Sequence, residues 1–112
     1  MYFTLYSRTK DITESKLLLN DIISKFPSGK CIDCGADNYW KMEGIFTSGA
    51  ELNISLSSQD ATIFLEKICD RWVTFGNPIR GFLASETIEG GCTFYDNRIS
   101  MIEISLDANE KN

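Results

Sequence analysis

Histidine is absent from the 112 residues of this chain. It is the side chain that most often transfers protons near neutral pH, and it is the commonest metal ligand in proteins. Its absence excludes Ser-His-Asp and Cys-His nucleophile arrangements, mixed Cys/His zinc sites and the two-histidine iron site. The composition therefore favours a protein that binds another molecule over an enzyme, and we predict no catalytic residue and no cofactor.

Signatures of phosphate binding, hydrolysis and export are also missing. Gly90-Gly91 lacks the lysine and the spacing of a phosphate-binding loop, and no serine lies in a Gly-x-Ser-x-Gly elbow. No apolar run approaches the roughly 20 residues that span a bilayer. The first residues lack the basic start and the long apolar stretch of a signal peptide. We therefore expect a cytoplasmic protein that does not bind membranes.

Basic residues are scarce in the second part of the chain. The formal net charge is −5, and residues 42–112 hold five basic side chains against eleven acidic ones. Two windows, residues 42–66 and 81–97, contain no Lys or Arg. A surface of this kind repels phosphate backbones and attracts a basic partner, so we predict a protein partner and no nucleic acid. Acidic side chains that serve only solubility would give the same charge balance.

Hydrophobic periodicity predicts two helices and six strands. Asp11, with Glu14 three residues later, marks the start of a helix whose apolar stripe runs to Phe26. Ser57 with Asp60 opens a second helix, which we expect to carry Cys69 and Trp72 and to end at residues 76–78. The predicted strands cover residues 2–7, 39–47, 51–56, 79–85, 92–95 and 98–106.

Short turns are expected between neighbouring strands. Ser48-Gly49-Ala50 would close a hairpin over residues 39–56, and Asp96-Asn97 would form a tight turn after residues 92–95. Residues 30–38 have mixed character and are expected to form a loop with a short strand inside it.

The predicted elements fit one architecture. Two amphipathic helices cannot cover both faces of six strands. We therefore predict an α+β fold, with a single, mainly antiparallel, twisted sheet of five to six strands and two helices packed on one face. Residues 1–112 are expected to form one globular domain with a frayed tail at 107–112.

Four cysteines are present, and we expect free thiols because a reducing compartment keeps them so. Cys31-Ile32-Asp33-Cys34 has the spacing of half a zinc module. The other half is missing, since Cys69 and Cys92 are isolated and are expected in the core. A thioredoxin-like site needs its first cysteine at a helix N-terminus, and the residues after Cys34 do not begin an amphipathic helix. We therefore predict no metal site, with Cys31 and Cys34 as the alternative.

Carboxylates gather in two parts of the sequence, the first of which also contains a tyrosine. Aromatic residues anchor protein interfaces, and carboxylates complement Lys and Arg on a partner. An ordinary solvated sheet face would have the same composition. The candidate partner-binding residues are Asp33, Asp37, Asn38, Tyr39, Glu43, Glu86, Glu89 and Asp96.

The small size, the missing catalytic residues and the acidic stretches from Glu43 to Glu66 and from Glu86 to Asp96 resemble the immunity proteins of bacterial toxin systems. Those are small cytosolic proteins that bind and neutralise a cognate toxin domain, often a basic nuclease. The resemblance implies a non-enzymatic inhibitor whose acidic surface covers the active-site cleft of a basic toxin domain. The alternatives are a Cys-dependent metal-binding or redox regulator, and an adaptor that binds without inhibiting; the oligomeric state stays open.

Replacing both Cys31 and Cys34 with serine separates the first two hypotheses. An inhibitor that works through a carboxylate surface keeps its activity in this double variant, whereas a metal-binding or redox protein that uses the pair loses its function. Bound zinc measured after dialysis provides the check, because near-stoichiometric metal in the parent protein would contradict the inhibitor hypothesis.

Overall fold

The computed structural model describes residues 1–26, 31–38, 44–52, 58–76 and 79–106, and of residues 31–38, 58 and 59 it describes the main chain. Its elements follow one another along the chain as β1 (Tyr2–Ser7), α1 (Ile12–Ile23), β2 (Cys31–Asn38), β3 (Phe46–Leu52), α2 (Ser58–Leu65), β4 (Val73–Phe75), β5 (Gly81–Ser85) and β6 (Ile99–Ser105).

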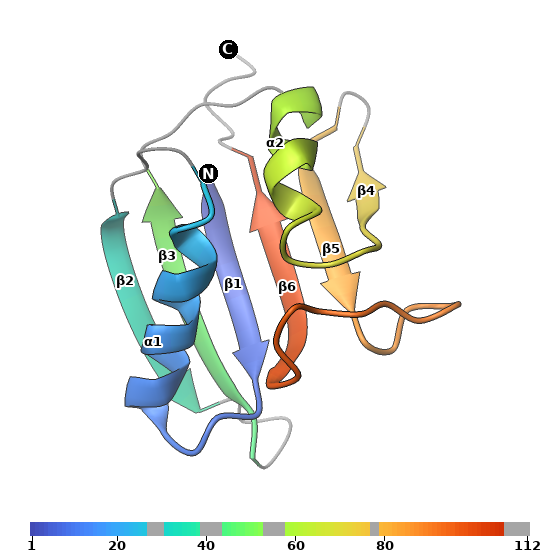
Figure 1. Cartoon of the computed structure of the whole chain (residues 1–112). Coiled ribbons are helices and arrows are strands. Elements are labelled where there is room, and N and C mark those ends of the chain that lie inside the picture. Colours follow the sequence, from blue (N-terminus) through green and yellow to red (C-terminus); the bar gives the residue numbers. More distant parts are fainter. Residues whose placement is uncertain (27–30, 39–43, 53–57, 77–78, 107–112) are drawn as a thin grey trace.

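The six strands form one sheet in the order β2-β3-β1-β6-β5-β4, and every neighbouring pair is antiparallel. Both helices lie over the same face of this sheet (Figure 1). The prediction of an α+β fold, with one antiparallel sheet and two helices on one side, is confirmed. Within the described residues, no helix is long and apolar enough to cross a membrane.

Side-chain alternation along the strands explains why the helices cover one face. In β1, Phe3 and Leu5 are fully buried, whereas Tyr2, which precedes Phe3, is 46% exposed. The same period of two buries Ile102 and Ile104 in β6. The inward side chains of the strands meet apolar residues of both helices in a single core. Burial of this core is the main favourable term in the folding free energy.

The start of α1 is formed as the sequence predicts. The Asp11 side chain accepts a hydrogen bond of 2.8 Å from the main-chain N–H of Glu14, which satisfies one of the free donors of the first turn. Leu18, Leu19 and Ile22 then fall on the buried face of the helix. Because these residues recur at spacings of three and four, one stripe of the helix packs on the sheet.

The second helix is shorter than predicted. It ends at Leu65, and the expected extension to residues 76–78 is wrong, because Val73–Phe75 form β4 and pair with β5. Ile68 is buried from the turns after the helix. The Trp72 indole N–H donates a 2.9 Å hydrogen bond to the carbonyl of Leu65. Apolar residues at helical spacing thus reach the core from a turn and an extended segment.

The predicted hairpin over residues 39–56 is also wrong. Ser48, Gly49 and Ala50, expected as its turn, lie in the middle of β3 and pair with β1. Residues 30–38 were expected to form a loop with a short strand inside it; residues 31–38 are instead strand throughout, as β2, and pair with β3. Ser48 and Ala50 are buried, so small residues serve close packing at this point and not chain reversal. Residues 39–43 and 53–56 of the predicted hairpin lie outside the described residues.

The chain before β6 differs from its prediction as well. Residues 92–95 do not form a strand, since Phe94 makes one isolated bridge with Cys69. The chain does turn at Asp96, whose carbonyl accepts a 3.2 Å hydrogen bond from Ile99 N–H. β6 instead pairs with β1 and β5, which lie on its two sides in the sheet. Long-range pairing therefore replaces the local hairpin.

Buried hydroxyl groups join α1 to the sheet. Ser7 Oγ donates to Ser15 Oγ at 3.3 Å, and Ser15 Oγ donates to Ser48 Oγ at 3.0 Å. Ser48 Oγ in turn donates to the Ser15 carbonyl at 3.3 Å. The three side chains are at most 1% exposed and come from β1, α1 and β3. Each hydroxyl has a partner, so this polar cluster costs little and fixes the position of α1 on the strands.

Replacing Ser48 with alanine should lower the free energy of unfolding by about 1–3 kcal/mol, because Ser15 is left without its buried acceptor. Denaturant unfolding measures the change. The matched control is Ser105→Ala on the exposed end of β6, for which a change within about 0.5 kcal/mol is expected. Equal effects of the two substitutions would contradict the role of the buried cluster.

Candidate protein interface

The second face of the sheet is not covered by either helix of the described chain (Figure 1). We call it the open face. It comprises the outward residues of five strands and the positions of β2 that are in register with them. Its members are Tyr2, Thr4, Tyr6, Asp33, Gly35, Asp37, Thr47, Gly49, Glu51, Val73, Phe75, Gly81, Leu83, Ser85, Met101, Glu103 and Ser105.

The charges of the open face have one sign. Glu51 of β3 and Glu103 of β6 contribute two carboxyl groups, and Asp33 and Asp37 occupy β2 positions in register with this face. No Lys or Arg occupies any open-face position of the described strands. Glu51 lies directly across from Tyr2, and Glu103 lies across from Thr4 on the other side of β1. The face is therefore anionic, with tyrosine and threonine between its carboxylates.

Two acidic residues are in register with each other on this face. Asp33 of β2 is in register with Glu51 of β3, next to a bulge in β2. Like charges directly opposite each other destabilise an antiparallel pair. Local rules of this kind are most often broken at functional sites. The Asp33–Glu51 register is therefore a reason to consider this face as a binding site.

The Tyr2 side chain reaches over β3 on the open face. A Cβ atom added to Gly49 would lie 2.6 Å from the Tyr2 hydroxyl oxygen, so the glycine leaves room for the end of this side chain. Tyr2 is 46% exposed. An exposed tyrosine beside a carboxylate combines the two side chains that protein interfaces use to receive a cationic residue.

The other end of the open face is apolar. Val73 is 41% and Phe75 46% exposed on the short edge strand β4. The Phe75 ring covers Gly81, where a Cβ atom would collide with it. Leu83 lies across from Val73, and Met101 continues this area on β6. Glu103 lies across from Leu83, so a partner would meet apolar side chains of β4 and β5 next to a carboxylate of β6.

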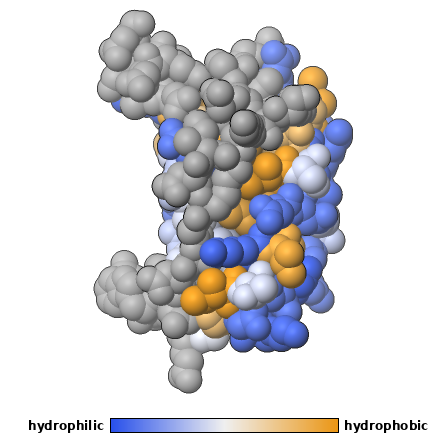
Figure 2. Space-filling model, turned by 90° about the vertical axis from the view of Figure 1, so that its left-hand side faces the viewer, coloured by the Kyte–Doolittle hydropathy of each residue, from blue (hydrophilic) through white to orange (hydrophobic). Residues whose placement is uncertain are grey.

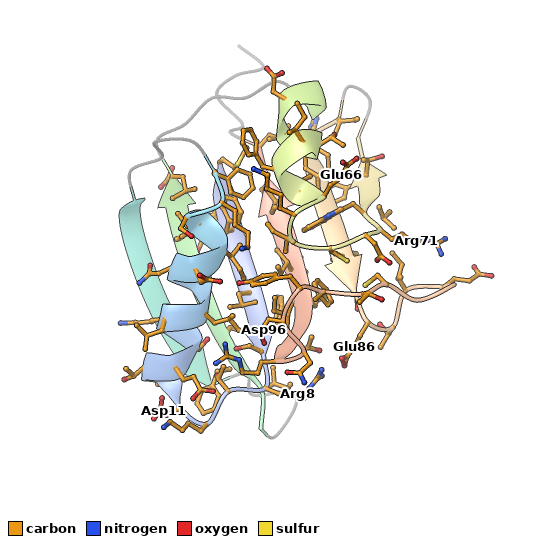
Figure 3. The ribbon with its side chains drawn as sticks, in the orientation of Figure 1. Arg8, Asp11, Glu66, Arg71, Glu86 and Asp96 are labelled. Atoms are coloured by element: carbon orange, nitrogen blue, oxygen red, sulfur yellow. The ribbon has the colours of Figure 1, made fainter. Side chains whose placement is uncertain are left out.

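Three carboxylates outside the open face, those of Glu14, Glu86 and Asp96, have arginine partners. Arg8 Nη1 lies 2.6 Å from Glu86 Oε1, and Arg98 Nη2 lies 2.7 Å from Asp96 Oδ2. Arg98 also lies 3.5 Å from Glu14 of α1. Arg8, Glu86 and Asp96 gather at the end of the molecule where β1 leads into α1 (Figure 3). These pairs compensate the acidic charge there.

The candidate residues are thus distributed over three places. Asp33 and Asp37 have open-face positions, and Asn38 ends β2 opposite Phe46. Tyr39 and Glu43 lie outside the described residues. Of the second group, Glu86 and Asp96 are bound by arginines, while Glu89 is exposed and has no ion pair within the described part of the chain.

The structure adds four residues that sequence reasoning did not select, namely Tyr2, Tyr6, Glu51 and Glu103. A signal for three of them was present, because Tyr2, Tyr6 and Glu103 alternate with apolar residues in predicted strands. For Glu51 there was no such signal. The mispredicted turn at residues 48–50 put Glu51 at the start of a strand, so its pairing with Tyr2 of β1 was not predicted.

The alternative cysteine site has a different location. Cys31 and Cys34 are in register with Leu52 and Ala50, which are buried on the helix-covered face. Among the described side chains, no group of three or more Cys, Asp or Glu is arranged to hold a metal ion. On the side seen in Figure 2, the described residues show apolar areas among hydrophilic ones.

Asp96 gives a test of the arginine pairs. Hydrogen bonds from Arg98 hold the pKa of the Asp96 carboxyl below its ordinary value of 3.8. A carboxyl with a lowered pKa stabilises the fold above its unfolded-state value, and this contribution disappears as the pH falls through its folded-state value. Asp96→Asn keeps an oxygen acceptor for the Arg98 main-chain N–H, which Asp96 Oδ1 accepts at 2.9 Å.

We therefore expect Asp96→Asn to lower the stability at neutral pH, with a difference from the parent that shrinks as the pH falls below 3.8. Urea unfolding at a series of pH values measures it, with Glu89→Gln as the exposed control. A difference that stays constant over the whole pH range would show that charge at Asp96 is not responsible.

Comparisons of the chain with protein-family models, with curated proteins and with solved structures give no match. The function is therefore inferred from the chemistry of the open face.

Proposed function

We propose that this chain is a non-enzymatic binding protein of the immunity type, which neutralises a basic protein by laying the open face over its cationic active-site cleft. The observation that carries the proposal is the charge of this face. It bears four carboxyl positions and exposed aromatic residues, with no Lys or Arg among its positions on the described strands. Elsewhere, Arg8 and Arg98 compensate carboxylates within the molecule.

The dimensions of the face suit a protein partner. Six strands at about 4.8 Å spacing give a width of about 24 Å. Five of the strands have five to eight residues and are about 17–26 Å long, whereas β4 has three residues. The resulting area of about 400–600 Å² is half or more of the roughly 800 Å² that each partner contributes to a standard interface.

The proposed mechanism is exclusion of substrate. In a nuclease, the cleft is lined with Lys and Arg that receive phosphate groups. Glu51 and Glu103, on strands separated by β1, would occupy positions near those cations and replace the phosphates. Tyr2, on the strand between them, supplies aromatic contact area. Long-range attraction between the two charged surfaces would accelerate association and weaken as salt is added.

The test uses the protein encoded by the reading frame next to that of this chain as the probe. The proposal predicts that this protein is basic, that it stops growth when produced alone, and that co-production of the chain restores growth. In the double variant Glu51→Lys/Glu103→Lys, association with the probe should be at least about tenfold slower than in the parent.

The matched control is Glu66→Lys/Glu89→Lys, which makes the same change in net charge at exposed positions outside the open face. Thermal unfolding shows that each variant is folded. A larger effect of the control pair than of the open-face pair would reject the open face as the interface. Failure of the neighbouring protein to bind the parent chain would reject the immunity function.

The single variant Glu51→Gln distinguishes a binding role from a structural one. It removes one of two like charges that are in register across β2 and β3, so the thermal midpoint should stay the same or rise. Association with the probe should slow. A carboxylate that merely stabilised the sheet would give the reverse result, with a lower midpoint and unchanged association.

A further inference from the structure

Cys69 and Cys92 form a second pair of cysteines, separate from Cys31 and Cys34 and from the open face. The segment after α2 and the segment before β6 run antiparallel to each other at this point. Tyr95 N–H donates to the Ile68 carbonyl at 2.8 Å, and Asp70 N–H donates to the Thr93 carbonyl at 3.2 Å. These two bonds set Cys69 opposite Phe94.

This pairing makes the two cysteines diagonal neighbours. Side chains alternate along an extended segment, so Cys92 and Phe94 lie on the same side as Cys69. The Thr93 N–H also donates to Asp70 Oδ1 at 2.7 Å, which is a further hydrogen bond between the two antiparallel segments. The two residues are far apart in sequence and are brought together by the main chain.

Each thiol has a defined position. Cys69 Sγ donates to the Arg71 carbonyl at 3.4 Å, and Cys92 Sγ donates to the Ser85 carbonyl at 3.0 Å. Cys69 is 2% exposed, whereas Cys92 is half-buried. Burial raises the pKa of the Cys69 thiol to about 12, and the adjacent Cys92 thiol adds to this rise. Cys92 is therefore the thiol that meets an oxidant first.

We propose that Cys69 and Cys92 are a thiol-oxidation site that forms a reversible intramolecular disulfide, with a low-molecular-weight disulfide such as oxidised glutathione as the oxidant. The inference does not depend on the proposed function. It applies to a different part of the molecule and assigns a reaction to two side chains that the binding surface does not use.

The reaction proceeds in two exchanges. The Cys92 thiol loses its proton to solvent, and the thiolate attacks one sulfur of oxidised glutathione; the glutathione S–S bond breaks and one glutathione thiolate leaves. The Cys69 thiol then loses its proton to solvent and its thiolate attacks Cys92 Sγ; the bond between Cys92 and glutathione breaks, and the second glutathione leaves as a thiolate that takes up a proton. Two protein thiols are oxidised, and one glutathione disulfide is reduced to two thiols.

The disulfide would connect two sequence-distant parts of the fold. It would close a chain segment that includes β4 and β5, which form one edge of the sheet. Closing a loop of this length restricts the unfolded chain and stabilises the folded state. Oxidation would thus raise the stability of the part of the fold that contains β4 and β5, without adding a contact to the open face.

The experiment oxidises the Cys31→Ser/Cys34→Ser variant, in which Cys69 and Cys92 are the remaining cysteines, with oxidised glutathione. We expect an intact mass lower by two hydrogens, a cross-linked peptide that joins Cys69 to Cys92, and a thermal midpoint raised by several degrees. Dithiothreitol should reverse all three. The parent chain should give the same linked peptide.

Cys69→Ala in the same background should stop at a glutathione adduct on Cys92, because the resolving thiol is gone. Cys92→Ser should prevent both the adduct and the disulfide, which gives a second readout if the buried substitution disturbs folding. Persistent glutathione adducts on Cys92 with Cys69 still reduced, or a parent disulfide that joins other cysteines, would overturn the proposal.

Discussion

Packing on one side of the sheet is the constraint on which the rest of the molecule depends. The buried apolar residues of β1, β3, β5 and β6 point to one side, where α1 and α2 complete a single core. Because both helices lie there, the other side carries polar, acidic and aromatic residues, with an apolar area around β4. The same alternation that buries Phe3 and Leu5 places Tyr2 and Tyr6 outside.

The carboxylates have two distinct environments in this arrangement. At the end of the molecule near Arg8, arginines bind Glu86 and Asp96, so the carboxylates there form ion pairs within the molecule. On the open face, Glu51 is in register with Asp33 and has no ion pair among the described residues. Net charge alone does not distinguish these environments, although they have opposite consequences for a partner. An uncompensated carboxylate can receive a cation from outside the molecule.

Sequence patterns predicted the fold class and the elements whose signals are local. The Asp11 cap, the apolar stripe of α1 and the alternation in residues 2–7 each depend on residues that are close together in the sequence, within a single helix or strand. Predictions failed where long-range pairing decides. Ser48-Gly49-Ala50 is typical of a turn, yet these small residues fit beneath α1 and Tyr2 within a central strand. Residues 92–95 have strand character but form an isolated bridge with the segment around Cys69 and no strand.

The candidate site was predicted in part for the same reason. Asp33 and Asp37 were selected from their local cluster, whereas their neighbours Glu51 and Glu103 become part of the face only through the order of the strands. Two arginines at positions 8 and 98 neutralise carboxylates that looked free in sequence, and only the folded chain brings Arg8 to Glu86. Register, and not composition, determines which acidic residues are available.

The most direct measurement of the central claim is the footprint of the bound partner on the amide resonances of this chain. Binding is expected to shift the amide resonances of Tyr2, Glu51 and Glu103, together with those of neighbouring open-face residues. Amides on the exposed side of α1, such as those of Lys16 and Asn20, should keep their positions. A footprint centred on the helices, with the open face unchanged, would contradict it.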